Sequence, residues 1–437
     1  MESYLIIGGG PGGYELAAEA AAKGHEVTLV ERDKLGGTCL NRGCIPTKAM
    51  AHAADILREA REGGAYGINC DLITIDFQKL CSRRDEVVAG LREGIDALMR
   101  GVKIIQGTAK FVGPKEVEVA TSGGETLTMT ADRIVIATGS APALLPIPGA
   151  ENAITSDDLL RLAQAPQTMV IIGGGVIGLE FASIFNALGT KVTVIEYCKE
   201  ILPQFDKDIA KRVRTQLAAA GITFLVGAEV KSVEPYAVNY EQKGKAATCD
   251  AEVVVMAVGR KPVLPEGLDR AGIELNRNAI KVNQSTMETT SPGVYAIGDV
   301  NAICMLAHAA SAQGRRVLGE DVNLDVIPSV VFTYPEVAMV GTTEQRLKEM
   351  GVEYKASKSF YRANGKAVSM GETSGIVKML TSPADGKILG CTIMGPHAAD
   401  MIEEVAVAMA NDLTVNAISR TIHPHPTLCE IVAAAAK

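Results

Sequence analysis

The sequence predicts an α/β fold with two βαβ units on parallel sheets, followed by a C-terminal α+β domain. Three observations lead to this prediction. A pattern of strand, glycine turn, helix and strand occurs twice, at residues 4–31 and 169–196. A further apolar strand that ends in glycine follows each copy, at 134–139 and 253–259. From about residue 322 strand-like and helical stretches alternate without a glycine turn, which is typical of an α+β domain.

The size and composition indicate a globular protein with several domains. A chain of 437 residues is too long for one hydrophobic core, and 47% hydrophobic with 22% charged residues is an ordinary globular composition. A net charge of −8 and the absence of Trp argue against nucleic acid or an anionic membrane as partners. Because no apolar stretch reaches about 18 residues, we expect no transmembrane helix. Nine cysteines, mostly isolated, favour a cytoplasmic location.

The two βαβ units align without a gap at an offset of 165 residues. Each carries a G-x-G-x-x-G turn and a terminal acid: Gly8, Gly10, Gly13 and Glu31 in the first, and Gly173, Gly175, Gly178 and Glu196 in the second. Such glycines allow a tight turn, close approach to a pyrophosphate at the helix N-terminus, and close helix–strand packing. The acid accepts hydrogen bonds from a ribose hydroxyl. The duplication predicts two Rossmann-like dinucleotide-binding domains and a relay between two cofactors, and the alternative is a pair of glycine turns without ligands.

Three later strands place residues beside these units. The strand at 134–139 ends in Thr138 and Gly139 and the strand at 253–259 ends in Gly259, and we expect each to close its sheet. The strand at 294–299 puts Asp299 at a carboxyl end, where ligands bind. In the C-terminal part we expect strands at 328–334, 376–381 and 387–394 and helices at 343–350 and 397–410. The predicted domains are 1–142, 143–260, 261–321 and 322–437.

Cys39 and Cys44 are the only close cysteine pair and follow Glu31 by a few residues. In a regular helix, residues five apart are separated by about 7.5 Å, too far for most disulfides. We expect Gly43 to let the backbone distort and bring the sulfurs together. The pair therefore predicts thiol–disulfide redox chemistry beside a nucleotide cofactor, and the alternative is two unrelated buried cysteines.

Residues 423–430 read His-Pro-His-Pro-Thr-Leu-Cys-Glu, in which the prolines hold the histidines in an extended segment. The chain looks helical from Thr427, which puts Glu430 in the first turn, where its carboxylate can orient an imidazole. His425 with Glu430 is thus a candidate general base for a thiol. A plain surface turn is the alternative. Cys429 and the two histidines resemble metal ligands, but without a fourth ligand nearby we expect no metal site.

Together these residues resemble the flavoprotein disulfide reductases, most closely the dihydrolipoamide dehydrogenase branch, over essentially the whole chain. The family's Gly-Gly-Thr-Cys-x4-Cys motif falls on residues 36–44 and its His-x-His-Pro-Thr-Leu-x-Glu motif on 423–430. The resemblance implies FAD at the first unit with Asp299 as a contact, and a nicotinamide cofactor at the second. It also implies Lys48 near the flavin with Glu180 as its acidic partner, and a homodimer in which the base comes from the other subunit.

The implied reaction is oxidation of dihydrolipoamide by NAD+. His425 takes a proton, the substrate thiolate attacks Cys39, Cys44 leaves toward the flavin, and electrons pass from FAD to NAD+. NAD rather than NADP follows from Glu196, which repels a 2′-phosphate, and no Arg lies between residues 197 and 203. The implied partners are lipoyl domains of a 2-oxoacid dehydrogenase or glycine cleavage complex.

Two other functions remain open. An NAD(P)H-dependent reductase of another small disulfide, such as glutathione, predicts arginines after the second glycine turn, and the sequence has none there. A non-catalytic FAD protein would tolerate loss of the dithiol or of the His425–Glu430 pair, and both are intact. Arg42 between the cysteines, where many relatives have an apolar residue, either favours a thiolate or points to solvent.

Overall fold

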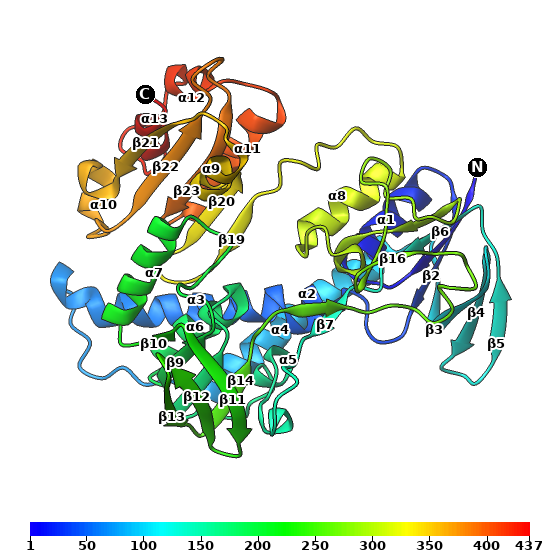
Figure 1. The fold of residues 1–437 in the computed structure, drawn as a ribbon, viewed down its shortest axis with the longest axis horizontal. Coiled ribbons are helices and arrows are strands. Elements are labelled where there is room, and N and C mark those ends of the chain that lie inside the picture. The colour runs from blue at the N-terminus through cyan, green and yellow to red at the C-terminus, as the bar shows by residue number, and fades with distance from the viewer. The chain divides into compact units, whose positions relative to one another are not determined.

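The computed structural model describes residues 1–437, and the chain forms two compact units. The first consists of Met1–Ala49, Gln78–Ala143 and Arg260–Leu324, and the second of Met50–Phe77, Leu144–Gly259 and Asp325–Lys437. Figure 1 labels the helices and strands along the chain. None of the helices combines the length and the apolar character that crossing a membrane would need.

A seven-stranded sheet in the order β18-β6-β1-β2-β3-β4-β5 organises the first unit. Neighbouring strands from β18 to β3 are parallel, while β3, β4 and β5 form an antiparallel extension. The strands are β1 (Ser3–Ile7), β2 (Glu26–Glu31), β3 (Lys103–Gly113), β4 (Glu116–Thr121), β5 (Thr126–Met129), β6 (Arg133–Ile136) and β18 (Val294–Ala296). The prediction that the strand at 134–139 closes this sheet is wrong, because the apolar β18 pairs with the outer side of β6 and becomes the edge.

Alternation along β1 explains why this sheet is covered on both faces. Tyr4 and Ile6 pack with apolar residues of the helices, whereas Leu5 and Ile7 pack with β3, β4 and the chain near Leu268. Helices α1 and α8 lie side by side (Figure 1). The helices are α1 (Pro11–Ala22), α2 (Gly37–Arg42), α4 (Phe77–Leu98), α8 (Ala307–Val317) and the 3₁₀ turn η3 (Gly298–Asn301). Short ribbons pair β7 (Ser140–Pro142) with β15 (Arg260–Pro262), and β16 (Leu275–Asn276) with β17 (Ala279–Ile280).

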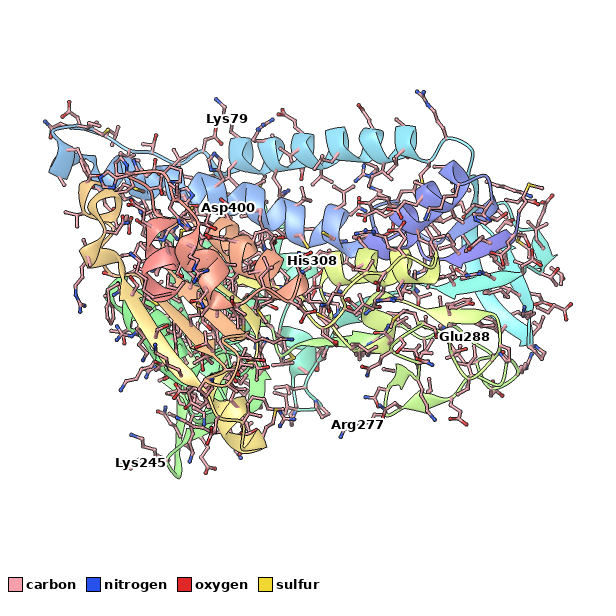
Figure 2. The ribbon with its side chains drawn as sticks, turned by 90° about the horizontal axis from the view of Figure 1, so that it is seen from above. Lys79, Lys245, Arg277, Glu288, His308 and Asp400 are labelled. Carbon is pink, nitrogen blue, oxygen red and sulfur yellow. The ribbon has the colours of Figure 1, made fainter.

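The second unit contains the second βαβ copy as a parallel sheet in the order β10-β9-β8-β14. Here the prediction for the strand at 253–259 is confirmed, since β14 is the edge. The elements are β8 (Thr168–Ile172), α6 (Val176–Ala187), β9 (Lys191–Glu196), α7 (Lys207–Ala219), β10 (Thr223–Val226) and β14 (Val253–Met256). An antiparallel sheet adds β11 (Ala228–Glu234), β12 (Ala237–Gln242) and β13 (Lys245–Asp250), with Lys245 at the tip of the last hairpin (Figure 2).

This unit has four further helical elements. They are α3 (Cys44–Glu62), which starts in the first unit, η1 (Gly63–Tyr66), η2 (Ala150–Asn152) and α5 (Ser156–Leu159).

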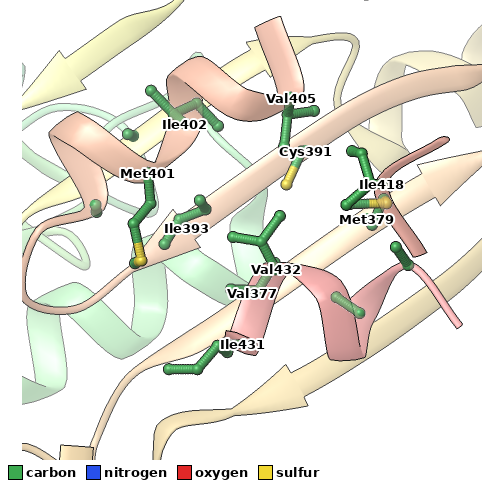
Figure 3. Close-up of a cluster of buried hydrophobic side chains, with 14 of the residues drawn as sticks. Val377, Met379, Cys391, Ile393, Met401, Ile402, Val405, Ile418, Ile431 and Val432 are labelled. Atoms are coloured by element: carbon green, nitrogen blue, oxygen red, sulfur yellow. The ribbon is translucent and has the colours of Figure 1, made fainter. Parts of the chain in front are cut away.

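The C-terminal part of the second unit is α+β, as the sequence predicts. Its five strands are antiparallel in the order β19-β20-β23-β22-β21. The strands are β19 (Ser329–Val331), β20 (Val337–Gly341), β21 (Lys355–Phe360), β22 (Ile376–Thr381) and β23 (Ile388–Met394). The helical elements are α9 (Glu344–Met350), η4 (Tyr361–Ala363), α10 (Gly365–Ser369), α11 (Ala398–Ala410), α12 (Val415–Arg420) and α13 (Glu430–Ala435). Figure 3 shows how β22 and β23 pack against α11 and α13 through Val377, Ile393, Ile402 and Val432.

Candidate active site

Two glycines of the first G-x-G-x-x-G turn have no room for a side chain. Gly8 has a φ of +112°, and a Cβ there would lie 2.3 Å from the Ala137 oxygen. A Cβ on Gly13 would lie 1.8 Å from the Gly8 oxygen. Gly10 differs, because the nearest atom to its Cβ position is the Gly37 Cα at 3.9 Å. Gly8 and Gly13 therefore allow close packing of the backbone, and Gly10 leaves space at the start of α1.

The second turn repeats this arrangement. A Cβ on Gly173 would lie 2.4 Å from the Ala257 oxygen, and one on Gly178 would lie 2.2 Å from the Gly173 oxygen. No atom lies within 4 Å of the Cβ position of Gly175. Gly10 and Gly175 are the N-cap residues of α1 and α6, and neither helix has a side-chain cap. Each helix therefore directs backbone N–H groups toward an open cradle that a pyrophosphate fits.

The terminal acids are held in the same way in both units. Each is buried, and each carboxylate accepts two backbone hydrogen bonds of 2.6–2.7 Å. The donors are the N–H groups of Gly9 and Asp33 for Glu31, and of Gly174 and Cys198 for Glu196. Since a carboxylate oxygen offers two lone pairs, each acid retains capacity for a ribose hydroxyl while its charge disfavours a 2′-phosphate.

The two cysteines meet where the chain breaks between α2 and α3. Gly43 is the break, and a Cβ there would lie 2.9 Å from the Thr38 oxygen and 3.3 Å from the Cys39 Cα. The Cys39 and Cys44 thiols are hydrogen bonded to each other. This hydrogen bond and burial raise the pKa of Cys39, while the positive charge of Lys48 acts in the opposite direction. The expectation that Gly43 distorts the helix is confirmed, and the backbone brings the sulfurs together.

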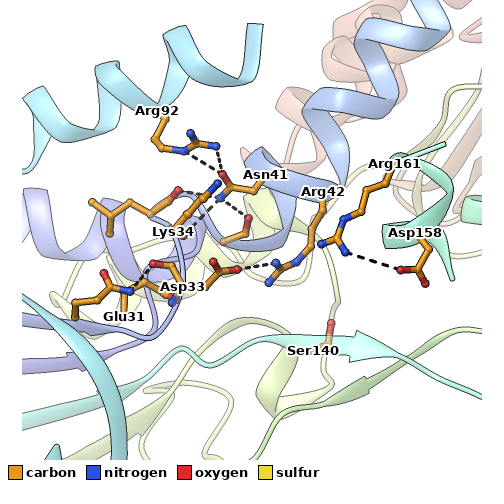
Figure 4. A network of polar contacts seen from close by, with 12 residues as sticks. Glu31, Asp33, Lys34, Asn41, Arg42, Arg92, Ser140, Asp158 and Arg161 are labelled. Atoms are coloured by element: carbon orange, nitrogen blue, oxygen red, sulfur yellow. Dashed lines mark hydrogen bonds and ion pairs between the residues drawn. The ribbon is translucent and has the colours of Figure 1, made fainter. Parts of the chain in front are cut away.

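Arg42, which lies between the cysteines, pairs with an acid in the loop after β2. Its Nη1 lies 2.7 Å from Asp33 Oδ2, and the Arg42 side chain is 31% exposed (Figure 4). The ion pair directs this guanidinium toward the loop that also donates to Glu31.

Lys48 and Glu180, predicted to act as a pair, belong to different units. Lys48 lies in α3, four residues after the helix begins at Cys44, and its charge acts on Cys39. Glu180 lies in α6, is 5% exposed, and accepts the Phe332 N–H at 3.0 Å. Their pairing stays a prediction.

Asp299 is held by two residues that the sequence did not single out. The Ser140 hydroxyl donates to Asp299 Oδ2 at 2.5 Å, and Arg260 Nε donates to the hydroxyl oxygen of Ser140 at 2.7 Å. The Thr138 hydroxyl donates to the Val263 carbonyl at 2.6 Å, so that its role toward a cofactor stays a prediction. Ser140 and Arg260 each directly follow a glycine that ends a predicted strand, and this shared position was the available signal.

Those two glycines, Gly139 and Gly259, have φ values of +69° and +117°. L-residues rarely adopt such angles, so each position requires glycine for the chain to turn away from its strand. Their proximity to cofactors stays a prediction.

The His-Pro segment brings His425 and Glu430, the predicted pair, into contact. His425 Nδ1 lies 3.0 Å from Glu430 Oε1, and the Thr427 N–H donates to Glu430 Oε2 at 3.0 Å. The Thr427 hydrogen bond and the His425 contact lower the pKa of Glu430. The His425 side chain is 77% exposed, whereas the His423 side chain is 8% exposed and is hydrogen bonded to Glu404 at 2.7 Å. Of the two histidines, His425 is the one available to a substrate.

A cavity of about 470 Å³ borders this segment. It is lined by Lys366, Met370, His397, Asp400, Met401, Pro426, Thr427, Leu428 and Cys429. Cys429 therefore faces an apolar cavity, and burial raises the pKa of its thiol.

An ionic cluster around the buried Lys378, which the sequence did not reveal, joins α7 to β22 and α9 in the second unit. The ammonium of Lys378, which is 1% exposed, lies 3.3 Å from Asp206, 2.8 Å from Asp208 and 2.6 Å from Glu344. Hydrogen bonds from Lys348, Lys378 and Tyr354 lower the pKa of Glu344 to about 2. The lysine supplies the cation among these carboxylates, so the cluster is an ion-pair network.

Comparisons with known proteins agree with this geometry. Residues 2–314 match the pyridine nucleotide-disulphide oxidoreductase family, and residues 327–436 match the dimerisation domain of that family. Dihydrolipoyl dehydrogenases of Geobacillus stearothermophilus and Chlamydia muridarum are 40% and 38% identical, each over 99% of this chain and 95% of the relative. The structure of LpdA from Mycobacterium tuberculosis superposes with a TM-score of 0.91 at 28% identity, over 100% of this chain and 99% of the other. The fold is thus two Rossmann-like domains and a C-terminal dimerisation domain, and the chain belongs to the pyridine nucleotide-disulphide oxidoreductase family.

Proposed function

We propose that the protein oxidises dihydrolipoamide to lipoamide with NAD+ as acceptor. The observation that carries the proposal is the contact between the Cys39 and Cys44 thiols at the Gly43 break, within the unit that contains the first cradle. Two thiols in contact in this way, once oxidised to a disulfide, exchange with a substrate dithiol through a mixed disulfide. The names of the relatives at 38–40% identity support the choice of substrate.

We propose that His425 is the base. Its Nδ1 contacts the Glu430 carboxylate, which only accepts hydrogen bonds, so the proton of the neutral ring lies on Nδ1 and Nε2 is free to take one from a thiol. The resulting thiolate attacks the Cys39 sulfur of the oxidised pair, and the Cys39–Cys44 bond breaks. The second substrate thiol then gives its proton to the departing Cys39 sulfur and attacks the first substrate sulfur, which closes the lipoamide disulfide and releases Cys39 as a thiol. Cys44 retains the electron pair at the N-terminus of α3, which favours a thiolate.

The family uses FAD and NAD(H), and both cradles fit dinucleotides. When bound, FAD accepts the electrons of the dithiol and delivers a hydride to NAD+. We propose that FAD is held by Gly8, Gly10, Gly13, Glu31, Lys48, Thr138, Gly139 and Asp299, and NAD by Gly173, Gly175, Gly178, Glu196 and Gly259. Lys48 and Glu180 are proposed to pair beside the flavin. The proposed domains are 1–142 for FAD, 143–260 for NAD, 261–321 completing the FAD site, and 322–437 for dimerisation.

We propose a cytoplasmic homodimer that serves the lipoyl domains of a 2-oxoacid dehydrogenase or glycine cleavage complex. The match to a dimerisation domain and the 77% exposure of the His425 side chain support a base that acts on the partner's dithiol.

The test is anaerobic reduction of NAD+ and NADP+ by dihydrolipoamide, with NADPH plus oxidised glutathione as the counter-assay. Fast NADH formation with NADP+ inert is the expected result. Turnover only with NADPH and glutathione would replace the substrate assignment with the disulfide reductase alternative.

A further inference from the structure

Asn41, midway between the two cysteines, connects the redox helix to a distant part of the first unit (Figure 4). Its side-chain amide donates to the carbonyls of Leu35 and Gly37, each at 2.9 Å. Its Oδ1 accepts from Arg92 Nε at 3.1 Å and from Arg92 Nη2 at 2.6 Å. Arg92 lies on α4, 51 residues away in sequence.

The chemistry of the groups settles the orientation of this amide. Carbonyl oxygens only accept and a guanidinium only donates, so the Asn41 nitrogen must face the turn and its oxygen must face Arg92. Arg92 forms no ion pair, unlike Arg42 with Asp33, and its guanidinium donates both of its hydrogen bonds to Asn41. A charged donor on the amide oxygen strengthens the bonds that the amide nitrogen gives to the turn.

The turn that Asn41 holds also contacts the first cradle. The Gly36 N–H donates to the Gly9 carbonyl at 2.8 Å, and a Cβ on Gly37 would lie 2.6 Å from the Gly10 Cα. Gly36 and Gly37 have φ values of +93° and +55°, which glycine adopts readily, and because glycine backbone is flexible the turn depends on its contacts for a fixed conformation. The turn is fixed from one side by the cradle and from the other by Asn41.

We infer that Arg92 is a positioning residue that acts through Asn41 to hold Cys39 in the register where its sulfur meets Cys44. The inference rests on the proposed function, in which these sulfurs form the redox disulfide. Loosening the 35–37 turn lets α2 shift on the fixed start of α3, which lowers the effective concentration of one sulfur at the other. A lower effective concentration makes the disulfide easier to reduce.

The experiment compares Arg92→Met and Arg92→Lys with wild type, and uses Arg83→Met as the matched control. Arg83 lies on the same helix, has a side chain that is 73% exposed, and contacts only Glu86, at 3.6 Å. The holoenzymes are equilibrated without NAD+ in redox buffers of oxidised and reduced dithiothreitol and quenched with acid. Alkylation and peptide mass mapping then report the oxidised fraction of the Cys39–Cys44 pair, and flavin absorbance and thermal unfolding are recorded in parallel.

We expect Arg92→Met to shift the dithiothreitol ratio at half-reduction by about tenfold toward easier reduction, since a hydrogen bond to a charged group is lost. Arg92→Lys should shift it less, and Arg83→Met should match wild type. An unchanged ratio in Arg92→Met, or an equal shift in Arg83→Met, overturns the inference. If Arg92→Met does not fold, the dithiothreitol ratio at half-reduction of Arg92→Lys tests the inference by itself: a shift toward easier reduction supports it, and an unchanged ratio overturns it. A wild-type protein that forms no Cys39–Cys44 disulfide in any buffer overturns the proposed relay itself.

Discussion

Replacing Gly175 with Ala should separate NAD+ binding from the fold. The N-cap residue has φ −80° and ψ −176°, which Ala adopts, and no atom lies within 4 Å of the new methyl group. The cost to the free energy of unfolding should therefore be only about 0.5–1 kcal/mol. The methyl group, however, occupies the cradle at the start of α6. Loss of one charge-assisted hydrogen bond to the pyrophosphate costs about 1.5–3 kcal/mol, which is about ten- to hundredfold in affinity.

The assay is the steady-state reduction of NAD+ by dihydrolipoamide, together with flavin absorbance and thermal unfolding. Gly175→Ala should raise the KM for NAD+ by about ten- to hundredfold while FAD content and Tm stay near wild type. Gly178→Ala is the matched control, because its methyl group would lie 2.2 Å from the Gly173 oxygen and should lower the Tm. An unchanged KM in Gly175→Ala would refute the role of the cradle.

Three further predictions concern other parts of the molecule. Glu430→Gln removes the charged acceptor at His425, and kcat for dihydrolipoamide oxidation should fall at least about tenfold; NADH-driven reduction of a one-electron acceptor should stay unchanged, and equal losses would contradict the base role. Glu196→Gln removes the charge that repels a 2′-phosphate, so the ratio of kcat/KM for NAD+ over NADP+ should fall about tenfold; a constant ratio would count against Glu196. Lys378→Met removes the buried cation between three carboxylates and leaves Asp206 without one, while Lys358 and Lys348 still pair with Asp208 and Glu344; it should lower the free energy of unfolding by about 3–5 kcal/mol. The pKa of Glu344 falls from 4.5 to about 2 on folding, so the stability that ionised Glu344 adds to the fold is complete above pH 4.5 and is lost toward pH 2. The Tm difference between wild type and Lys378→Met should therefore narrow in acid. A Tm difference that does not change with pH would contradict the link between Glu344 and Lys378.

The features that sequence reasoning predicted correctly are those encoded locally. The glycines, the strand and the acid of each βαβ unit lie within about 30 residues, and each imposes its own backbone geometry. The His425–Glu430 contact is likewise set within five residues. Local spacing also predicted the break at Gly43, because two cysteines five apart meet only if the helix is interrupted.

The features that it missed depend on long-range contacts or on weak patterns. Arg92 is 51 residues from Asn41, and the carboxylate of Asp208 is 170 residues from Lys378, so no local spacing reveals either partner. The strand β21 reads Lys-Ala-Ser-Lys-Ser-Phe, a polar pattern that suits the edge of a sheet but not a buried strand. The prediction that the strand at 134–139 closes its sheet was wrong for a related reason, because strand order is decided by pairing between distant segments.

The two βαβ units hold their terminal acids by equivalent backbone hydrogen bonds, but their surroundings at the glycine turn differ. This difference suits their proposed cofactors. In the first, the 35–37 turn packs against Gly10, and the residue two after the acid, Asp33, is bound to Arg42 in the redox helix. In the second, no atom lies within 4 Å of the Cβ position of Gly175, and the equivalent residue is Cys198 rather than an acid. The turn beside the dithiol therefore lies against Gly10 in the first cradle, whereas no segment comes as close to Gly175 in the second. A relay between two dinucleotides needs this asymmetry, because one cofactor must stay beside the sulfurs while the other exchanges at every turnover.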